Sequence, residues 1–145
     1  MAGTWKWYGN GLLNVMKGAI DLDTDTFKLM LTTSTYVPNQ DTHVFRSDVT
    51  NEVGASGTYA AGGATLAGVS VTYDTATNEA RVAWTSPSFT SATITARNAV
   101  IYKSRGGAAT ADELVAYCTE AADVTSTAGT FTVTLPSPTL KITAA

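Results

Sequence analysis

The chain has one cysteine, Cys118, and one histidine, His43, among its 145 residues. A single cysteine excludes a disulfide within the chain, and a single histidine excludes a metal site built from several histidines. Cys118 lies in the strand-like run ELVAYCT, where we expect a small buried hydrophobic residue. We expect His43 to form hydrogen bonds within its own loop. The chain therefore predicts no cofactor and no required metal.

Charge is also scarce. Charged residues make up 14% of the chain, the net charge is −3, and Lys and Arg form no run. Proteins that hold nucleic acid by its phosphates usually carry a basic patch, so no nucleic-acid partner is expected. No apolar run approaches the roughly 20 residues that cross a bilayer, and MAGTWKWYGN lacks the features of a signal peptide. We expect no membrane partner, and synthesis in a cytoplasm.

Small neutral residues take the place of charge. Thr, Ser, Ala and Gly are abundant, and 44% of the residues are hydrophobic, which is enough for a core. Thr favours strands because its branched Cβ fits a pleated surface, and Gly and Ser favour turns. The length is that of one ordinary domain.

Alternating apolar and polar residues predict a series of short strands. From Phe27 to Thr32 the period is two, as expected for a strand with one covered face. Further strands are expected over residues 65–73, 80–85, 96–104, 114–119, 130–135 and 140–142, of which the first two form a hairpin. This spacing predicts a mainly β, single-domain antiparallel β-sandwich. A jelly-roll-like arrangement of the strands is one alternative. One or two short helices are expected, over residues 9–18 and 47–53.

The first 18 residues predict an N-terminal arm with a short helix, ahead of a sandwich domain over residues 19–145. Trp5, Trp7 and Tyr8 crowd this arm, and alternation puts Trp5 and Trp7 on one side of an extended arm. Two interpretations stay open. The aromatic residues anchor an interface with a sister subunit or a partner, or the arm folds back over its own sandwich.

Three aspartates at alternate positions, Asp21, Asp23 and Asp25, precede the first strand. An EF-hand loop that began at Asp21 would need Gly at its sixth position and Glu at its twelfth. Those positions hold Thr26 and Thr32. We therefore expect a turn in which the aspartate side chains bond nearby backbone N–H groups, and no metal site.

The residue patterns of common enzymes are missing. The chain has no G-x-S-x-G elbow that would expose a nucleophile. The glycine-rich run from Gly54 to Gly68 matches neither G-x-G-x-x-G nor a P-loop, and it precedes a strand rather than a helix. Nothing in the sequence indicates a pair of carboxylates of the glycosidase kind. We expect a protein that is not an enzyme.

The run from Gly18 to Ser104 resembles a family of small virion proteins from tailed bacteriophages. The resembling features, in the order in which that family has them, are GAIDLDTDTFKLMLTTSTYVPNQDTH, SDV, AAGGATLAG, VTYD and TARNAVIYKS. The segments WKWYGNG and TLPSPTLKITAA near the two ends depart from the family's pattern. The resemblance implies a virion structural protein, and it suggests a capsid decoration (cement) protein without catalytic residues.

As a decoration protein, the chain would bridge subunits of the major capsid protein on the capsid surface of the virion, after synthesis in the cytoplasm of a host bacterium. A homo-oligomer, either a dimer or a trimer, suits the symmetric junctions of a capsid. Two alternatives stay open: a tail or neck component of the virion, and a receptor- or glycan-binding module. The candidate interface residues are Trp5, Trp7, Tyr8, Tyr36, His43 and Tyr59.

Overall fold

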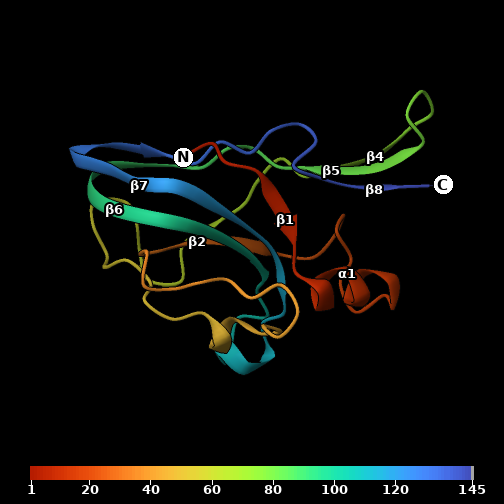
Figure 1. Cartoon of the computed structure of the whole chain (residues 1–145), viewed down its shortest axis with the longest axis horizontal. Helices are drawn as coiled ribbons and strands as arrows, with labels where there is room; N and C mark the ends of the chain where they lie inside the picture. Colours follow the sequence, from red (N-terminus) through yellow and green to blue (C-terminus); the bar gives the residue numbers. More distant parts are fainter. Residues whose placement is uncertain (145) are drawn as a thin grey trace.

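Two antiparallel β-sheets form the framework of the computed structural model, which describes residues 1–144 (Figure 1). The larger sheet has the order β1-β7-β6-β2-β3 and consists of β1 (Trp5–Trp7), β2 (Phe27–Thr32), β3 (Ala64–Thr65), β6 (Ser88–Lys103) and β7 (Leu114–Thr132). The smaller sheet has the order β4-β5-β8 and consists of β4 (Ser70–Asp74), β5 (Glu79–Ala83) and β8 (Leu140–Thr143). The mainly β, antiparallel sandwich is confirmed.

The connections between the strands include hairpins, short helical segments and one long loop after β2. One α-helix, α1 (Gly9–Met16), follows β1, and two 3₁₀ turns, η1 (Arg46–Asp48) and η2 (Ala109–Ala111), interrupt the loops. Strands that follow each other in the chain pair within one sheet, β4 with β5 and β6 with β7, so the jelly-roll form does not describe this sandwich. No helix among the described residues is long and apolar enough to span a membrane.

The expected helices have different outcomes. The helix over residues 9–18 is confirmed as α1. The helix over residues 47–53 is reduced to the single turn η1, because the chain is already extended at Val49. The carboxylate of Asp48 closes this turn by accepting the backbone N–H groups of Val44 and Phe45 at 2.8 and 2.9 Å. These hydrogen bonds lower the pKa of Asp48.

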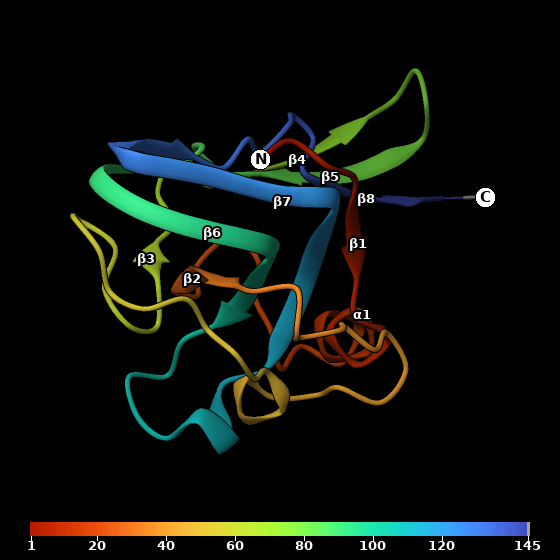
Figure 2. The ribbon, with the colours of Figure 1, turned by 60° about the vertical axis from the view of Figure 1, so that its left-hand side comes forward.

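The pairing of β6 with β7 is much longer than the sequence predicts (Figure 2). The strands expected over residues 96–104 and 114–119 lie almost wholly in these two strands, whereas only the first half of the strand expected over 130–135 does, because β7 ends at Thr132. Their register shifts at four places, and Ser91 and Ala128 near the distal end have positive φ angles of 51° and 46°. Such bulges insert residues that break the period of two, so the sequence pattern hides the outer halves of both strands.

Strand β2 is covered on both faces, although the sequence predicts one covered face. Phe27, Leu29 and Leu31 point into the main core between the sheets. Met30 points to the opposite face, into a second cluster with Tyr102 and other residues under the long loop that follows β2. That loop, over residues 33–63, covers a sheet face that would otherwise be exposed.

Asn98 of β6 fastens this loop to the sheet. Its side chain is fully buried, and its Nδ2 donates to the carbonyl oxygens of Thr33 and Tyr36 and to the hydroxyl of Thr32 at 2.9–3.1 Å. Its Oδ1 accepts from the Thr119 hydroxyl at 2.8 Å. One amide therefore joins β2, β6, β7 and the start of the loop.

The N-terminal segment is part of the sandwich and not a separate arm, which corrects the division at residue 18. Strand β1 pairs with β7, with Trp5 opposite Cys118. The backbone N–H groups of Ala2 and Gly3 donate to Glu120 at 2.6 and 2.7 Å. The segment folds back because packing on the core removes the apolar surface of Trp5 and Trp7 from water. This outcome is the second of the two interpretations given above.

Cys118 is a buried strand residue, as the sequence predicts. Its side chain is 1% exposed, and burial raises the pKa of its thiol to about 11. A Cβ atom added to Gly3 would lie 2.7 Å from the Cys118 sulfur, so the glycine allows β1 to lie close to β7 at this point.

We expect the substitution Asn98→Ala to lower the free energy of unfolding by about 3 kcal/mol, because each buried polar group left unpaired costs about 1–3 kcal/mol. The matched control is Thr119→Ser, which keeps the hydroxyl that donates to Asn98 Oδ1 and should cost less than about 1 kcal/mol. Urea unfolding measures both values. Equal losses for the two variants would show that Asn98 does not anchor the loop.

Candidate functional site

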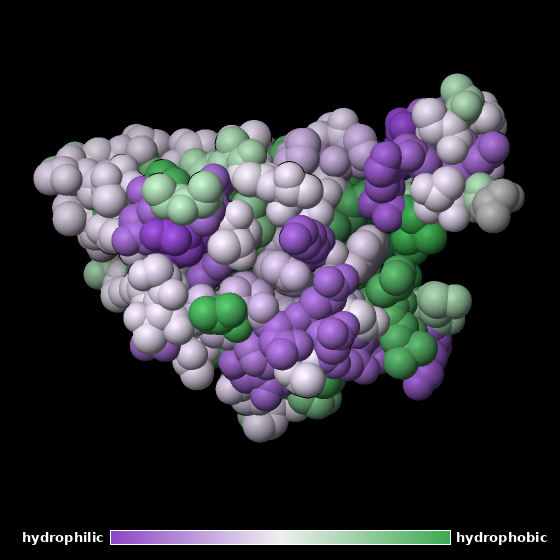
Figure 3. All heavy atoms as spheres, in the orientation of Figure 1, coloured by the Kyte–Doolittle hydropathy of each residue, from purple (hydrophilic) through white to green (hydrophobic). Residues whose placement is uncertain are grey.

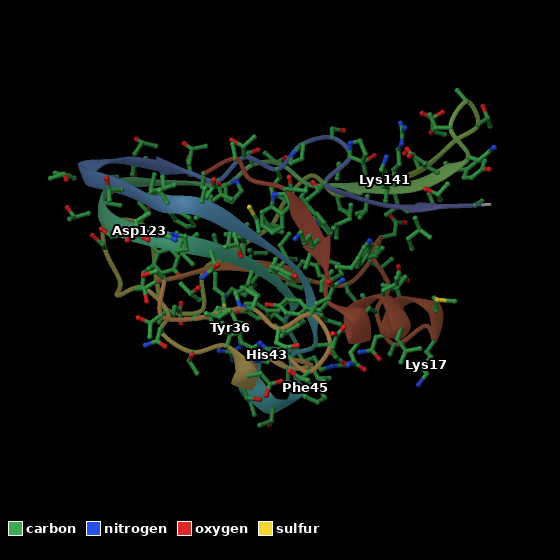
Figure 4. The ribbon with its side chains drawn as sticks, in the orientation of Figure 1. Lys17, Tyr36, His43, Phe45, Asp123 and Lys141 are labelled. Carbon is green, nitrogen blue, oxygen red and sulfur yellow. The ribbon has the colours of Figure 1, made fainter. Side chains whose placement is uncertain are left out.

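The aromatic residues Tyr8 and Tyr36, expected at an interface, form a hydrogen-bond chain with His43. Figure 4 shows Tyr36 and His43 close together. The hydroxyls of Tyr8 and Tyr36 lie 2.9 Å apart, and the Tyr36 hydroxyl lies 2.9 Å from Nδ1 of His43. The N–H of Asn39 donates to the same Nδ1 at 3.3 Å. Nδ1 is thus an acceptor, so Tyr36 donates to His43 and accepts from Tyr8. His43 bonds within its own loop, as expected.

The side chains of Tyr8 and Tyr36 are too deeply buried to contact a partner protein. Tyr8 is fully buried and Tyr36 is 3% exposed, and burial raises the pKa of each hydroxyl, which therefore stays protonated. Of the three side chains Tyr8, Tyr36 and His43, only that of His43 is partly exposed. The cluster fastens the loop over residues 36–43 to the start of α1, and it corrects the expectation that Tyr8 and Tyr36 contact a partner.

Tyr59 is also internal, at 1% exposure. Its hydroxyl accepts from the N–H of Leu31 at 2.9 Å and donates to Glu52 at 2.8 Å. The same Glu52 oxygen accepts from the N–H of Gly62 at 2.6 Å. Tyr59 therefore holds the loop against β2, and its assignment to an interface is wrong.

Trp5 and Trp7 lie on the same side of β1, as alternation predicts, but their partner is the C-terminal segment of the same chain. The indole N–H of Trp5 donates to the carbonyl of Thr134 at 3.3 Å, and that of Trp7 donates to the carbonyl of Lys141 at 3.2 Å. Together they line a hollow of about 450 Å³ with Pro136 and neighbouring residues. Trp5 is 8% exposed, and Trp7 is partly exposed.

The aspartate ladder forms the expected turn. The carboxylate of Asp21 accepts the N–H groups of Asp23 and Thr24 at 3.0 and 3.3 Å, and Asp25 accepts the N–H of Asp21 at 2.7 Å. The hydrogen bonds with Thr24 and Asp23 lower the pKa of Asp21. Asp25 also pairs with Lys103 at 2.6 Å. The carboxylates therefore serve the turn and the start of β2.

A polar pocket of about 330 Å³ lies beside β2 and β6, and its carboxylates are held by protein groups. Asp112 pairs with Arg46 at 2.8 Å and accepts the N–H of Arg105 at 2.8 Å. The Arg46 guanidinium lies over the ring of Tyr102, 5.3 Å from its centroid. Glu52 is engaged as described above. Within residues 1–144, no group of three or more His, Cys, Asp or Glu side chains has an arrangement that suits a metal ion.

One hollow on the surface is almost wholly apolar. A groove of about 190 Å³ lies between α1 and the three-stranded sheet. We call it the α1–β8 groove, and its lining residues are Trp7, Val15, Leu22, Val71, Ala80, Arg81, Val82, Leu140 and Ile142. Figure 3 shows hydrophobic residues gathered at the right of the molecule, between the projecting small sheet and α1. The floor, Val82 and Leu140, belongs to the main core.

The small sheet is amphipathic, which explains why it presents an apolar face. Alternation places Val71 opposite Val82 and Tyr73 opposite Ala80 on the groove side. The other face carries an ion-pair network. Arg81 pairs with Asp74 and with Glu79, and Lys141 pairs with Glu79 at 2.6 Å. Arg81, the only charged residue in the groove lining, thus has its side chain paired on this opposite face.

Helix α1 leaves two of its apolar side chains exposed. Gly11 is its only buried residue, and a Cβ atom there would lie 2.6 Å from the carbonyl oxygen of Leu114. The helix therefore packs on β7 through its backbone. Leu13 and Met16 are 42% and 78% exposed, whereas Val15 lines the groove and packs against the main core. The sequence expectation that the apolar side of this helix docks on its own sandwich is only partly met.

Sequence reasoning missed the residues that form the open surface. Val71 and Ile142 were expected in strands, but a strand pattern does not tell whether its apolar face is covered. They are 44% and 38% exposed, and Tyr73 is 55% exposed. One signal in the sequence could have indicated this exposed face: few predicted strands remain that could cover the hairpin of β4 and β5.

Comparisons with protein-family models, with curated proteins and with solved structures found no match. The resemblance to virion proteins of tailed phages therefore rests on the sequence features alone.

We expect acid to weaken the small sheet through Glu79. The Lys141 ammonium and the Arg81 guanidinium lower the pKa of Glu79 from 4.5 to about 2. A lowered folded-state pKa gives stability that is present above pH 4.5 and is lost as the pH falls toward 2. The difference in urea midpoint between the wild type and Glu79→Gln should therefore be constant above about pH 5 and shrink below it. A difference independent of pH would mean that these ion pairs contribute nothing.

Proposed function

We propose that the protein is a non-enzymatic structural component of a tailed-phage virion, a decoration protein that binds the major capsid protein on the head surface. The resemblance of residues 18–104 supports the virion assignment. The β-sandwich framework suits a rigid module that presents a binding surface. The observation that carries the proposal is the open α1–β8 groove with its exposed apolar rim.

Exposed apolar residues that lie together call for a partner. Val15 of α1 lines one side of the groove, and the exposed residues Val71 and Ile142 line the other. Soluble proteins rarely keep contiguous apolar surface of this kind unless it takes part in an interaction. The interaction releases water from these side chains, and the gain scales with the apolar area that is buried.

The size and charge of the α1–β8 groove indicate which kind of chemical group it binds. A volume of about 190 Å³ corresponds to roughly six water molecules at about 30 Å³ each, which is the space of one large side chain. The neutralised Arg81 offers no free charge to a polar ligand. An apolar side chain on a surface segment of the major capsid protein is the occupant that this chemistry favours.

Such an anchor also explains why a decoration role fits. Burial of one large apolar side chain is worth about 1.5–3 kcal/mol, which is too weak to hold an isolated pair of proteins. Many copies on a symmetric shell add multivalent strength. A protein that binds the assembled shell and not its free subunits stabilises the shell by mass action.

Co-assembly with the major capsid protein tests the proposal. The wild-type protein should co-purify with assembled shells in copy numbers that approach those of the major capsid protein, as measured by gel densitometry. Ile142→Asp places a charge in the groove lining and should reduce occupancy at least about tenfold, a loss of about 1.4 kcal/mol per site or more.

The matched control is Val37→Asp, which adds the same charge at a position that is 74% exposed and does not line the groove. It should bind as the wild type does. A wild-type protein present in only a handful of copies per particle would indicate a tail or neck component. Equal binding by both variants would exclude the α1–β8 groove as the docking surface.

A further inference from the structure

Strand β4 is an open edge of the small sheet. It is the outer strand in the order β4-β5-β8, and four of its five residues are exposed while the fifth is partly exposed. Figure 1 shows the hairpin of β4 and β5 standing clear of the rest of the molecule. Proteins usually protect such edges with lysine, proline, a bulge or a covering segment. The sequence of β4, SVTYD, has no lysine or proline, and its pairing with β5 has no register shift.

The other outer strands are shorter or partly covered. Strand β3 has two residues and β1 has three. In β8 the carbonyl of Lys141 already accepts a hydrogen bond from Trp7. Strand β4 is therefore the longest of the four outer strands, and the backbone groups on its outer side are available to a partner.

The direction of the free backbone groups follows from the bonds of β5. The carbonyl of Asn78 accepts from Ala144, next to β8, at 2.7 Å, and the N–H of Thr85 donates to Ala67, next to β4, at 2.9 Å. Backbone groups alternate in direction along a strand. Odd-numbered residues of β5 consequently bond to β4, and Arg81 is one of them.

Arg81 pairs with Thr72, so the backbone groups of Thr72 point inward, to β5. The N–H and C=O groups of Val71 and Tyr73 then point to the free edge. These two residues also carry the exposed apolar side chains of the strand, at 44% and 55% exposure.

We propose that β4 pairs with β4 of a second copy of this chain in an antiparallel, two-fold symmetric dimer centred on Thr72. In this register Val71 of each copy lies opposite Tyr73 of the other, and each pair exchanges both backbone hydrogen bonds. The two three-stranded sheets become one continuous sheet.

The side chains of this register complement each other. Val71 opposite Tyr73 is a β-branched–aromatic pair, and Thr72 opposite Thr72 is a hydrogen-bonding pair, both of which stabilise antiparallel sheets. The only charged residue of the strand, Asp74, lies opposite Ser70, and Arg81 neutralises it within its own chain. No like charges meet, and an isologous contact closes the assembly at two copies.

The dimer does not depend on the proposed capsid role, and its residues allow separate tests. Thr72 lies on the polar face, and neither Thr72 nor Tyr73 lines the α1–β8 groove. Failure of the dimer would therefore leave the groove proposal standing, and failure of shell binding would leave the dimer standing.

Cross-linking tests the register. Directly opposite residues in a non-hydrogen-bonded antiparallel pair have Cα atoms about 4.5 Å apart, within the range of about 4.4–6.8 Å that a disulfide spans. The Thr72→Cys variant should form a covalent dimer on mild oxidation. The control is Ser70→Cys, on the same face, where two copies lie four residues apart at about 3.4 Å per residue and cannot be bridged. The native Cys118 is buried and should not react.

Sedimentation velocity over a concentration series from micromolar to submillimolar tests the backbone bonds. The wild type should sediment as a dimer. Tyr73→Pro removes the outward N–H, which an edge strand tolerates, and should weaken self-association at least about tenfold. Tyr73→Phe loses the same hydroxyl contact with Asn78 but keeps the N–H, and should self-associate as the wild type does.

Three outcomes would overturn the proposal: a wild type that stays monomeric, equal cross-linking of Thr72→Cys and Ser70→Cys, or equal self-association of Tyr73→Pro and Tyr73→Phe. A strand from another protein that occupies this edge would give the first outcome. Circular dichroism of each variant verifies that the sandwich is folded.

Discussion

The long antiparallel pairing of β6 with β7 is the interaction on which the other parts of the structure depend. It gives β1 and β2 the edges against which they pair, and its inner side supplies much of the main core. Asn98, in the middle of β6, connects this ladder to the loop that covers the outer face of β2. The β-bulges between β6 and β7 bend this pair of strands. The smaller sheet packs against the same core through Val82 and Leu140.

The smaller sheet has a different physical character. Its outer half carries no covering layer, and its apolar side faces the gap beside α1, which packs on β7 through Gly11. Ion pairs around Arg81 and Glu79 connect the side chains of its polar face. A rigid ladder thus supports an amphipathic sheet whose edge and face are both free. The proposed capsid docking uses the face, and the proposed dimer uses the edge.

Local patterns in the sequence predicted what depends on local physics: strand β2, the β4–β5 hairpin, the turn at Asp21 and the burial of Cys118. Long-range contacts decided the rest. The indole groups of Trp5 and Trp7 find carbonyl partners near the opposite end of the chain, which no local pattern contains. The groove escaped prediction because alternation tells which side chains share a face but not whether another element covers that face. The tyrosines were misassigned because a buried hydroxyl with an internal partner looks the same in sequence as an exposed one.

Amide hydrogen exchange of the protein, free and bound to assembled shells, tests the docking surface most directly. In the free protein we expect the slowest exchange in the paired segments of β6 and β7, since they are the most deeply packed, and faster exchange in the small sheet. On binding, protection should increase in α1 and β8, on the two sides of the groove, while β6 and β7 stay unchanged. Unchanged exchange in α1 and β8, together with new protection elsewhere on the surface, would contradict the assignment of the α1–β8 groove as the capsid-binding surface.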